Sequence, residues 1–341
     1  MVQMLQALAS LKLTLLGMVL LGIGAALSYG NPEHVSVWVL VAPLALLAAN
    51  LAAAILTNPR INRQPGLLVF HVGLLGMVLL AGIGRLTHLD AHLEIGKEQA
   101  FSPELLMDVR KGPWHAGALD KVAFTQGGFT VDYAPKLRRG LTHSQVFLPQ
   151  PDGSMLEIDV GDDRPLVLER YRFYTTHNKG FAPVLTWIPE EGERVSGRVH
   201  MPSYPLFEYK QDNHWIPPGT EEDIKFWLQL DTGMTLEDAW VLDGRNSRGV
   251  LVVTSGDQRV ELKPGEETQL PHGRLRFDYL TTWMGYRVFY DPTIQWLFFV
   301  SVAGVFGLGQ FFWKKLSLTA WMDDDSPADD NNGTANKRGS V

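Results

Sequence analysis

The chain has 341 residues, a formal net charge of −7 and no cysteine. The length allows more than one domain. The lack of cysteine excludes disulfides, a thiolate nucleophile, cysteine-ligated zinc, an iron–sulfur cluster and covalent haem attachment to this chain. After Trp321, five aspartates against Lys337 and Arg338 leave a local charge of −3, so the rest of the chain carries only −4. This mild charge predicts neither a nucleic-acid-binding surface nor a polybasic lipid-binding patch.

Four nearly uncharged apolar runs stand out along the chain, at residues 11–30, 35–57, 66–86 and 293–313. At a rise of 1.5 Å per residue, about twenty helical residues cross a hydrocarbon core of about 30 Å. The pattern therefore predicts four transmembrane helices. Three belong to a membrane region of residues 1–89, and the fourth occupies a segment of residues 291–315. The first run is alternatively a cleaved signal peptide, although only Lys12 opens it.

The basic residues near the helix ends predict one orientation. Arg60 and Arg63 lie between the second and third runs, and Lys314 and Lys315 follow the fourth, whereas the loop after the first run has no Lys or Arg. Because cytoplasmic loops are enriched in Lys and Arg, we expect both termini in the cytoplasm and the long insert outside. Arg85 opposes this assignment, but long translocated domains commonly override a single charge.

The insert, residues 90–290, is predicted to be β-rich. The stretches "SMLEIDV" and "RVELK" alternate apolar and polar side chains, and "GVLVVTS" is a continuous apolar strand. Residues 273–292 look like two strands leading into the fourth helix, and residues 221–230 fit either a strand or a short helix. Turn signals separate these runs, and "MPSYP" and "WIPPGT" are typical of surface loops. We expect an antiparallel sandwich or a pair of packed sheets, followed beyond the last helix by a disordered acidic cytoplasmic tail, residues 316–341.

His71 is the one polar side chain in residues 66–84. It lies roughly 7–8 Å along the helix from the start of this run, and ionisable groups at such depth are costly and usually functional. Three uses are open: a metal or haem ligand, a proton relay, or a hydrogen bond to a neighbouring helix, for which Asn50 is a candidate. Gly73 and Gly76 allow close helix packing. Three apolar residues share the helical face of His71: Leu75, Val78 and Gly82.

A second histidine motif, "HLDAH", places His88 and His92 four residues apart. If the third helix continues that far, both imidazoles lie on one helical face and could bind a metal or assist haem exit. The alternative is a pair of exposed histidines at the membrane surface. The other histidines of the insert have no ligand-like spacing and are typical of surface or packing residues: His115, His143, His177, His200, His214 and His272.

The whole plan resembles the ResB-like family (ResB/CcsB) of the System II pathway of cytochrome c biogenesis. That family has three N-terminal helices, a large outward β-rich domain and one last helix. Five stretches carry the resemblance in order: "NLAAAILTNPR", "FHVGLLGMVLLAGIG", "LEIGKEQAF", "IDVGDDRPLVLERYRFYTTHNKGFAP" and "VFYDPTIQWLFFVSVAGVFGLGQFF". Together they cover most of residues 11–313. The order of the matches and the architecture carry more weight than any single motif.

The resemblance implies a haem-delivery protein of the bacterial inner membrane, with residues 90–290 on the periplasmic side. Such proteins work with a CcsA/ResC-like partner to carry haem b outward and present it to apocytochrome c, whose CxxCH thiols form thioether bonds to the haem vinyls. His71 occupies the position of the family's haem-ligating histidine. We expect no catalysis by this chain alone.

Three departures from the family limit what the resemblance implies. The insert is short for the family, and the tryptophan-rich haem-handling motif belongs to the partner. With one deep histidine, a second axial ligand must come from another chain. The competing function is a structural or assembly subunit of another membrane complex, which binds partners through its outer domain and binds no haem.

Overall fold

The structure is a computed structural model that describes residues 2–30, 34–246 and 248–322. The chain divides into two compact units, a helical unit of residues 1–86 with 293–341 and a β unit of residues 87–292. Residues 323–341, which hold most of the predicted acidic tail, lie outside the described residues, as do residues 31–33 of the predicted first loop. The two units are described separately.

The helical unit contains four helices that are long and apolar enough to cross a membrane, in agreement with the four predicted runs. They are α2 (Leu11–Gly30), α3 (Trp38–Thr57), α5 (Pro65–Thr87) and the first twenty residues of α6 (Ile294–Met322). Two short helices were not predicted, α1 (Val2–Leu8) and α4 (Pro59–Asn62). Helix α6 continues to Met322, so the tail predicted from residue 316 begins inside a helix.

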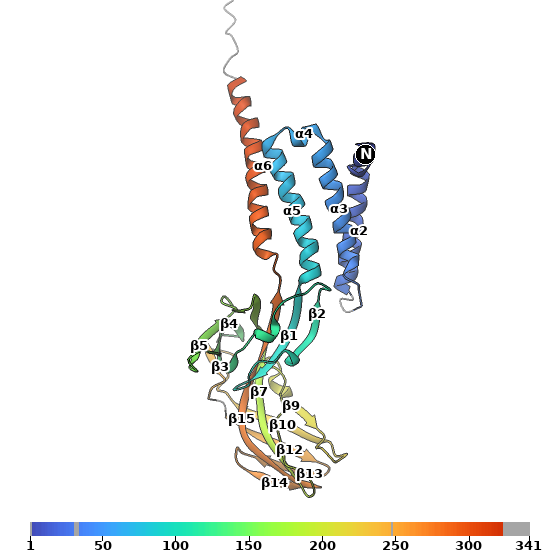
Figure 1. The fold of residues 1–341 in the computed structure, drawn as a ribbon. Coiled ribbons are helices and arrows are strands. Elements are labelled where there is room, and N and C mark those ends of the chain that lie inside the picture. Colours follow the sequence, from blue (N-terminus) through green and yellow to red (C-terminus); the bar gives the residue numbers. More distant parts are fainter. Residues whose placement is uncertain (1, 31–33, 247, 323–341) are drawn as a thin grey trace, which may run out of the picture. The chain divides into compact units, whose positions relative to one another are not determined.

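Helix α4 lies in the loop where the basic residues of the orientation argument occur. Asn58 caps it by accepting a hydrogen bond from the Arg60 backbone N–H, and Pro59 occupies the first helical position. Proline is favoured there because its missing N–H would have no helical partner. This local sequence therefore ends α3 and folds the connection to α5 into one extra turn (Figure 1).

Helices α5 and α6 pack through glycines. A Cβ placed on Gly73 would lie 2.8 Å from the Gly304 Cα and 2.9 Å from the Val300 carbonyl oxygen. A Cβ on Gly66 would lie 2.7 Å from the Phe311 backbone nitrogen. Only residues without a side chain permit this backbone approach, which is the usual way in which helices associate in lipid.

The β unit is built from three antiparallel sheets rather than one sandwich. The largest sheet has seven strands in the order β2-β1-β15-β7-β6, with β14 added to β15 and β8 added to β7. Its strands are β1 (Leu89–Gly96), β2 (Leu106–Lys111), β6 (Leu166–Leu168), β7 (Tyr171–Pro189), β8 (Val195–Arg198), β14 (Glu267–Leu270) and β15 (Gly273–Tyr290).

Two four-stranded sheets complete the β unit. One has the order β11-β3-β4-β5 and the other the order β13-β12-β10-β9. The strands of the first are β3 (Thr125–Ala134), β4 (Arg138–Pro149), β5 (Met155–Gly161) and β11 (Trp240–Asp243). Those of the second are β9 (Asp212–Trp215), β10 (Ile224–Asp231), β12 (Arg248–Ser255) and β13 (Gln258–Leu262). Of residues 221–230, for which a strand or a short helix was predicted, residues 224–230 belong to strand β10 and none is helical.

The long strands β7 and β15 pair along most of their length and form the spine of the β unit. Residues 273–292 were predicted as two strands, which is wrong, because β15 is a single strand of 18 residues. Its pairing with β7 shifts register twice, between Phe277 and Tyr279 and between Met284 and Tyr286. Such bulges bend a strand without ending it, so the break in the sequence pattern is a bend.

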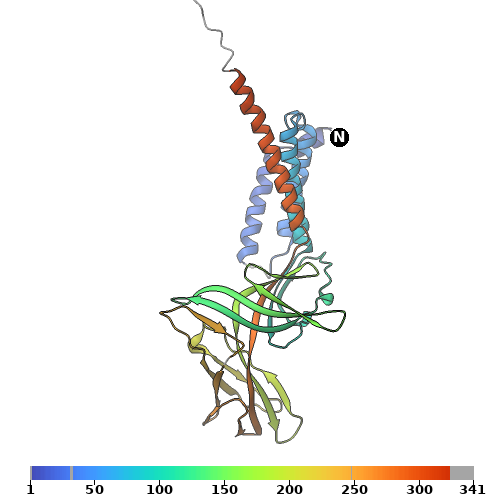
Figure 2. The ribbon, with the colours of Figure 1, turned by 90° about the vertical axis from the view of Figure 1, so that its left-hand side faces the viewer.

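Each four-stranded sheet covers a different half of the spine (Figure 2). Strands β3 to β5 cover one half, where Phe124 meets the β7 residue Phe173 edge to face with ring centroids 5.2 Å apart. Strands β9 to β13 cover the other, where Trp215 lies edge to face with Trp187 of β7. The two halves share one continuous hydrophobic core.

The segment "MPSYP" was predicted as a surface loop, which is wrong. Met201 is 1% exposed and Tyr204 is 4% exposed. Tyr204 packs against Phe181, and the Met201 carbonyl accepts a hydrogen bond from the Trp283 indole N–H. The prolines indicate an irregular backbone but not its depth, because backbone groups in a loop can be buried once side chains satisfy them.

Candidate functional site

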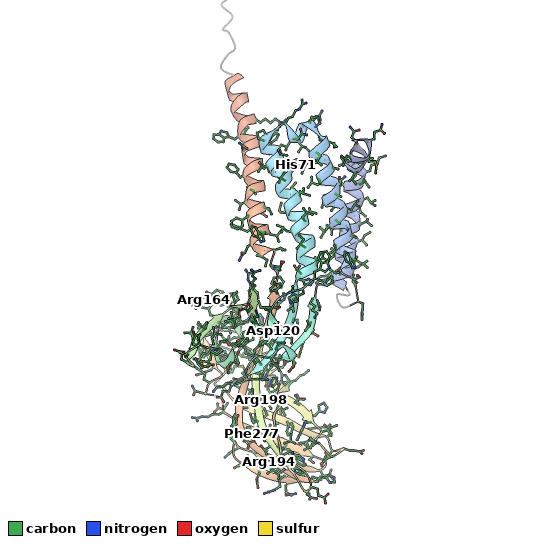
Figure 3. All side chains as sticks on the ribbon, in the orientation of Figure 1. His71, Asp120, Arg164, Arg194, Arg198 and Phe277 are labelled. Atoms are coloured by element: carbon green, nitrogen blue, oxygen red, sulfur yellow. The ribbon has the colours of Figure 1, made fainter. Side chains whose placement is uncertain are left out.

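His71 lies in the first half of α5, and Figure 3 labels it on that helix. Its side chain is half-buried, with the Phe70 ring edge-on at a centroid distance of 5.2 Å. The imidazole Nδ1 lies 2.7 Å from the Leu67 carbonyl oxygen, one turn earlier in the same helix. Because a carbonyl oxygen only accepts, Nδ1 carries a proton, and in the neutral imidazole Nε2 is then the nitrogen with the lone pair.

The lone pair on Nε2 has no hydrogen-bond partner among the residues that the structure describes. A neutral imidazole held through Nδ1–H, with its Nε2 free, is the form in which histidine binds metals. The same arrangement suits a haem iron, whose axial ligand is commonly a histidine. The chemistry of this side chain therefore fits the ligand hypothesis.

His71 also points away from the close helix pair. It is two residues before Gly73, which corresponds to about 200° around the helix axis. Since Gly73 and Gly66 contact α6, the imidazole lies on the opposite face of α5, together with Leu75 and Val78. That face is half-buried and has no glycine-to-backbone contact with α6; farther along it, a Cβ on Gly82 would lie 4.0 Å from the Leu44 Cβ of α3.

Asn50 was the candidate hydrogen-bond partner of His71, and this hypothesis is wrong. Asn50 is 4% exposed, and its amide donates to the carbonyl oxygens of Leu8 and Ser10 at 2.6 Å and 3.0 Å. Its amide oxygen accepts from the Thr14 hydroxyl at 2.7 Å. The break between α1 and α2 leaves the Leu8 carbonyl without a helical partner, and Asn50 satisfies it. The Ser10 carbonyl also accepts from the Leu13 and Thr14 backbone N–H groups at 3.0 Å and 3.3 Å.

The motif "HLDAH" does not form a helical pair. Helix α5 ends at Thr87, and β1 begins at Leu89, so His92 lies on a strand. Four residues of extended chain span about 13 Å, roughly twice the separation across a helical turn. His92 instead pairs with Asp108 of β2, with Nδ1 3.5 Å from the carboxylate. The premise that one helical face unites the two imidazoles is therefore wrong, because strand pairing with β15 prevails over helix continuation.

The remaining histidines of the β unit have varied surroundings. His143 and His214 pair with nearby aspartates, and His200 stacks on Trp283 with the ring planes 4° apart. Both ring nitrogens of His115 have a hydrogen-bonding partner: Nδ1 lies 2.9 Å from the Thr87 carbonyl oxygen, and Nε2 lies 2.7 Å from the Tyr171 hydroxyl. Burial raises the pKa of Tyr171 to about 12, so this hydroxyl stays protonated and donates to the imidazole.

The β unit also contains a cluster of charged residues around Lys179 that the sequence did not predict. Lys179 on β7 is 1% exposed, and burial, followed by the nearby Arg139, lowers its pKa to about 8. Arg139 of β4 and Asp162, just after β5, form an ion pair beside it with a separation of 2.5 Å. The exposed His177 completes the group, with Nδ1 3.2 Å from an Arg139 nitrogen. A lysine in "TTHNKGFAP" is ordinary in sequence, and only the folding of β7 buries it.

Within the described residues, no group of three or more His, Asp or Glu side chains is arranged to hold a metal ion. No protein-family model matches this chain, and no curated protein matches it. The two sites of interest are therefore His71 in the helical unit and the Lys179 group in the β unit. Both are defined by their own geometry.

Proposed function

We propose that this chain is a ResB-like haem-delivery subunit of cytochrome c maturation. The observation that carries the proposal is His71, whose Nε2 offers a lone pair within the otherwise apolar residues 66–84 of α5. The order of motifs along the chain and the combination of four apolar helices with a large β-rich insert support it. In this role His71 is an axial ligand of the transported haem b, and the chain binds cargo without performing chemistry alone.

The proposed setting is a bacterial inner membrane, with both termini cytoplasmic and the β unit on the periplasmic side. The basic residues Arg60, Arg63 and Lys315 support this orientation. The second axial ligand comes from a CcsA/ResC-like membrane partner. The haem is then handed to apocytochrome c. A reporter fused after Lys315 should be cytoplasmic, and one inserted near Gly219 should be outside; a translocated reporter at Lys315 contradicts the orientation.

The decisive experiment compares His71→Ala, His71→Asn and the neighbouring control Val72→Ala. Each variant is expressed with the partner, and the purified complex is examined by absorption spectroscopy and by its yield of cytochrome c. We expect both His71 variants to assemble normally but to lose the low-spin haem spectrum and cytochrome c yield, because neither retains an imidazole. Val72→Ala should keep both. Added imidazole should partly restore the spectrum of His71→Ala by filling the vacated ligand position.

His71→Asn separates the ligand role from a packing role. Asparagine keeps a polar group that can bond to a helix carbonyl but is a poor iron ligand. Normal haem content and normal cytochrome c yield in His71→Asn would refute the proposal. A wild-type complex that contains no haem at all would favour the structural or assembly subunit. His88 and His92 are tested together by replacing both with Ala, which should lower cytochrome c yield only if they assist haem exit.

A further inference from the structure

Lys179 is buried without the partners that an ammonium normally has. The side chain is 1% exposed, and its one hydrogen bond within the described residues runs from Nζ to the His177 carbonyl oxygen at 3.5 Å. An ammonium has three donors, and a buried charge without compensation is costly. A cost of this kind is usually retained only where it serves a function.

The backbone that holds Lys179 is an irregular stretch of β7. Thr175 pairs with Tyr286 and Lys179 pairs with Met284, so four steps along β7 correspond to two along β15. Thr176 fixes the extra residues by donating to the Gly285 carbonyl at 2.9 Å. The Asn178 side-chain oxygen accepts a hydrogen bond from the Ser203 hydroxyl at 3.3 Å. The bulge therefore turns His177 outward and Lys179 inward at one point of the sheet.

The charged groups around this bulge have a surplus of positive charge. Arg139 and Lys179 are cations, and Asp162 is the carboxylate that acts on both. Asp162 makes three hydrogen bonds, none of them to Lys179: Oδ1 accepts from Arg139 at 2.5 Å and from Thr175 at 2.6 Å, and Oδ2 accepts from the Thr142 N–H at 3.2 Å. Asp162 therefore orients Arg139 and leaves the charge of Lys179 unmatched.

The group is open to solvent on one side. His177 is exposed, and the side chains of Arg139 and Asp162 are 15% and 31% exposed. An incoming ligand thus meets the imidazole and the guanidinium first and the ammonium below them. Arginine and lysine side chains held together in this way bind carboxylate and phosphate oxygens through charge-assisted hydrogen bonds.

We propose that Lys179, Arg139 and His177 form a binding site for a single oxyanion, a carboxylate or a phosphate group, on the β unit. Its identification with a propionate carboxylate of the transported haem rests on the proposed function. The oxyanion site itself does not, because it follows from the unmatched buried cation and its open side. A free phosphate ion is the other source of the same chemistry.

The first arm of the test uses inorganic phosphate and the detergent-solubilised full chain. Isothermal titration calorimetry should detect phosphate binding to the wild type. Lys179→Met, which keeps an unbranched side chain only one atom shorter and removes its charge, should weaken phosphate binding about tenfold or more. The control Lys225→Met should leave the affinity unchanged.

The second arm uses protoporphyrin IX, which lacks iron and so does not need His71. Its dimethyl ester keeps the ring but has no carboxylates. Quenching of tryptophan fluorescence should show that Lys179→Met weakens protoporphyrin binding about tenfold and leaves binding of the ester unchanged. His71→Ala should leave both affinities unchanged, so failure of the haem-ligand proposal is distinguishable from failure here.

Three outcomes decide the matter. Lys179-dependent binding of phosphate and protoporphyrin supports the oxyanion site and its assignment to propionate. Lys179-dependent binding of phosphate alone supports the site and overturns the propionate assignment. Binding of neither, or binding that Lys179→Met does not alter, overturns the proposal. If Lys179→Met fails to fold, His177→Ala at the exposed end of the group decides, because a phosphate affinity unchanged by this substitution contradicts the site.

Discussion

In the helical unit, α5 and α6 approach each other through Gly66, Gly73 and Gly304, with backbone against backbone. In the β unit, the strands of the spine meet their covering sheets through large aromatic side chains such as Phe173 and Trp187. The difference follows from the surroundings that each unit is built for. Lipid offers no hydrophobic gain when helices associate, so close van der Waals contact must hold them. In water, burial of apolar surface does stabilise the packing, and large buried side chains contribute most of this free energy.

The two units also satisfy buried polar groups differently. In the helical unit, Asn50 makes three hydrogen bonds at the junction between helices α1 and α2. In the β unit, Gln126, Ser144 and Tyr286 form a closed ring of hydrogen bonds of 2.8 Å, 2.7 Å and 2.9 Å. Lys179 departs from both patterns, since its charge is buried but poorly matched. Three other buried polar atoms have no hydrogen-bond partner among the described residues, Trp187 Nε1, Gln211 Oε1 and Trp240 Nε1, but all three are neutral. Lys179 is the buried group that carries a charge, which marks it as a candidate functional position.

The largest effect is expected from enlarging the glycine contact. Gly73→Leu places a side chain where a Cβ alone already lies 2.8 Å from the Gly304 Cα. Because both sides are backbone, neither can move away, and the helix pair should lose about 3 kcal/mol or more. Unfolding in SDS, followed by circular dichroism, measures this loss. In Gly22→Leu, a Cβ would meet nothing within 4 Å among the described residues, so this control should behave as wild type.

The next effect is a gain in stability from removing the buried charge. Folding lowers the pKa of Lys179 from 10.5 to about 8, so the unfolded chain binds more protons between these values. The penalty is therefore present in full below about pH 8 and disappears as the pH rises through about 10.5. Lys179→Met should stabilise the β unit by about 3 kcal/mol at pH 7. Urea unfolding followed by near-ultraviolet circular dichroism should show this gain shrinking at high pH; a gain independent of pH would contradict the origin assigned to it.

A smaller loss is expected from opening the hydrogen-bond ring. Tyr286→Phe removes the hydroxyl that joins Ser144 to Gln126, and it leaves their fully buried polar atoms short of one partner. The cost should be about 1–3 kcal/mol in the same urea experiment. Tyr209→Phe is the matched control, because that ring is 88% exposed. Equal effects of the two substitutions would show that the ring contributes nothing to stability.

The smallest effect is expected at the surface ion pair between His92 and Asp108, which the structure has in place of the predicted pairing of His92 with His88. Asp108→Asn removes the charge that faces His92 at 3.5 Å, and asparagine tolerates the positive φ of 50° at this position. Both side chains are about half exposed, so solvent screens the pair, and the change should stay below about 0.5 kcal/mol. A larger loss would mean that the pair fixes the β1–β2 edge.

The sequence by itself determined the four apolar helices, the β-rich character of residues 90–290 and the unusual place of His71. These depend on composition, on local periodicity and on the cost of a polar group in an apolar run, all of which are readable along the chain. Gly73 and Gly76 were likewise readable as packing positions, because only small residues let helices approach closely.

Only the tertiary structure decided the rest. Thr87 ends α5 because the following residues gain more by pairing with β15 than by extending a helix. Asn50 bonds to the end of α1 and not to His71. The loop around Tyr204 is part of the hydrophobic core and not of the surface. The Lys179 group joins residues from β4, the segment after β5 and β7. Its parts are up to forty residues apart in sequence, and no local pattern encodes a charge that is buried only when distant strands pair.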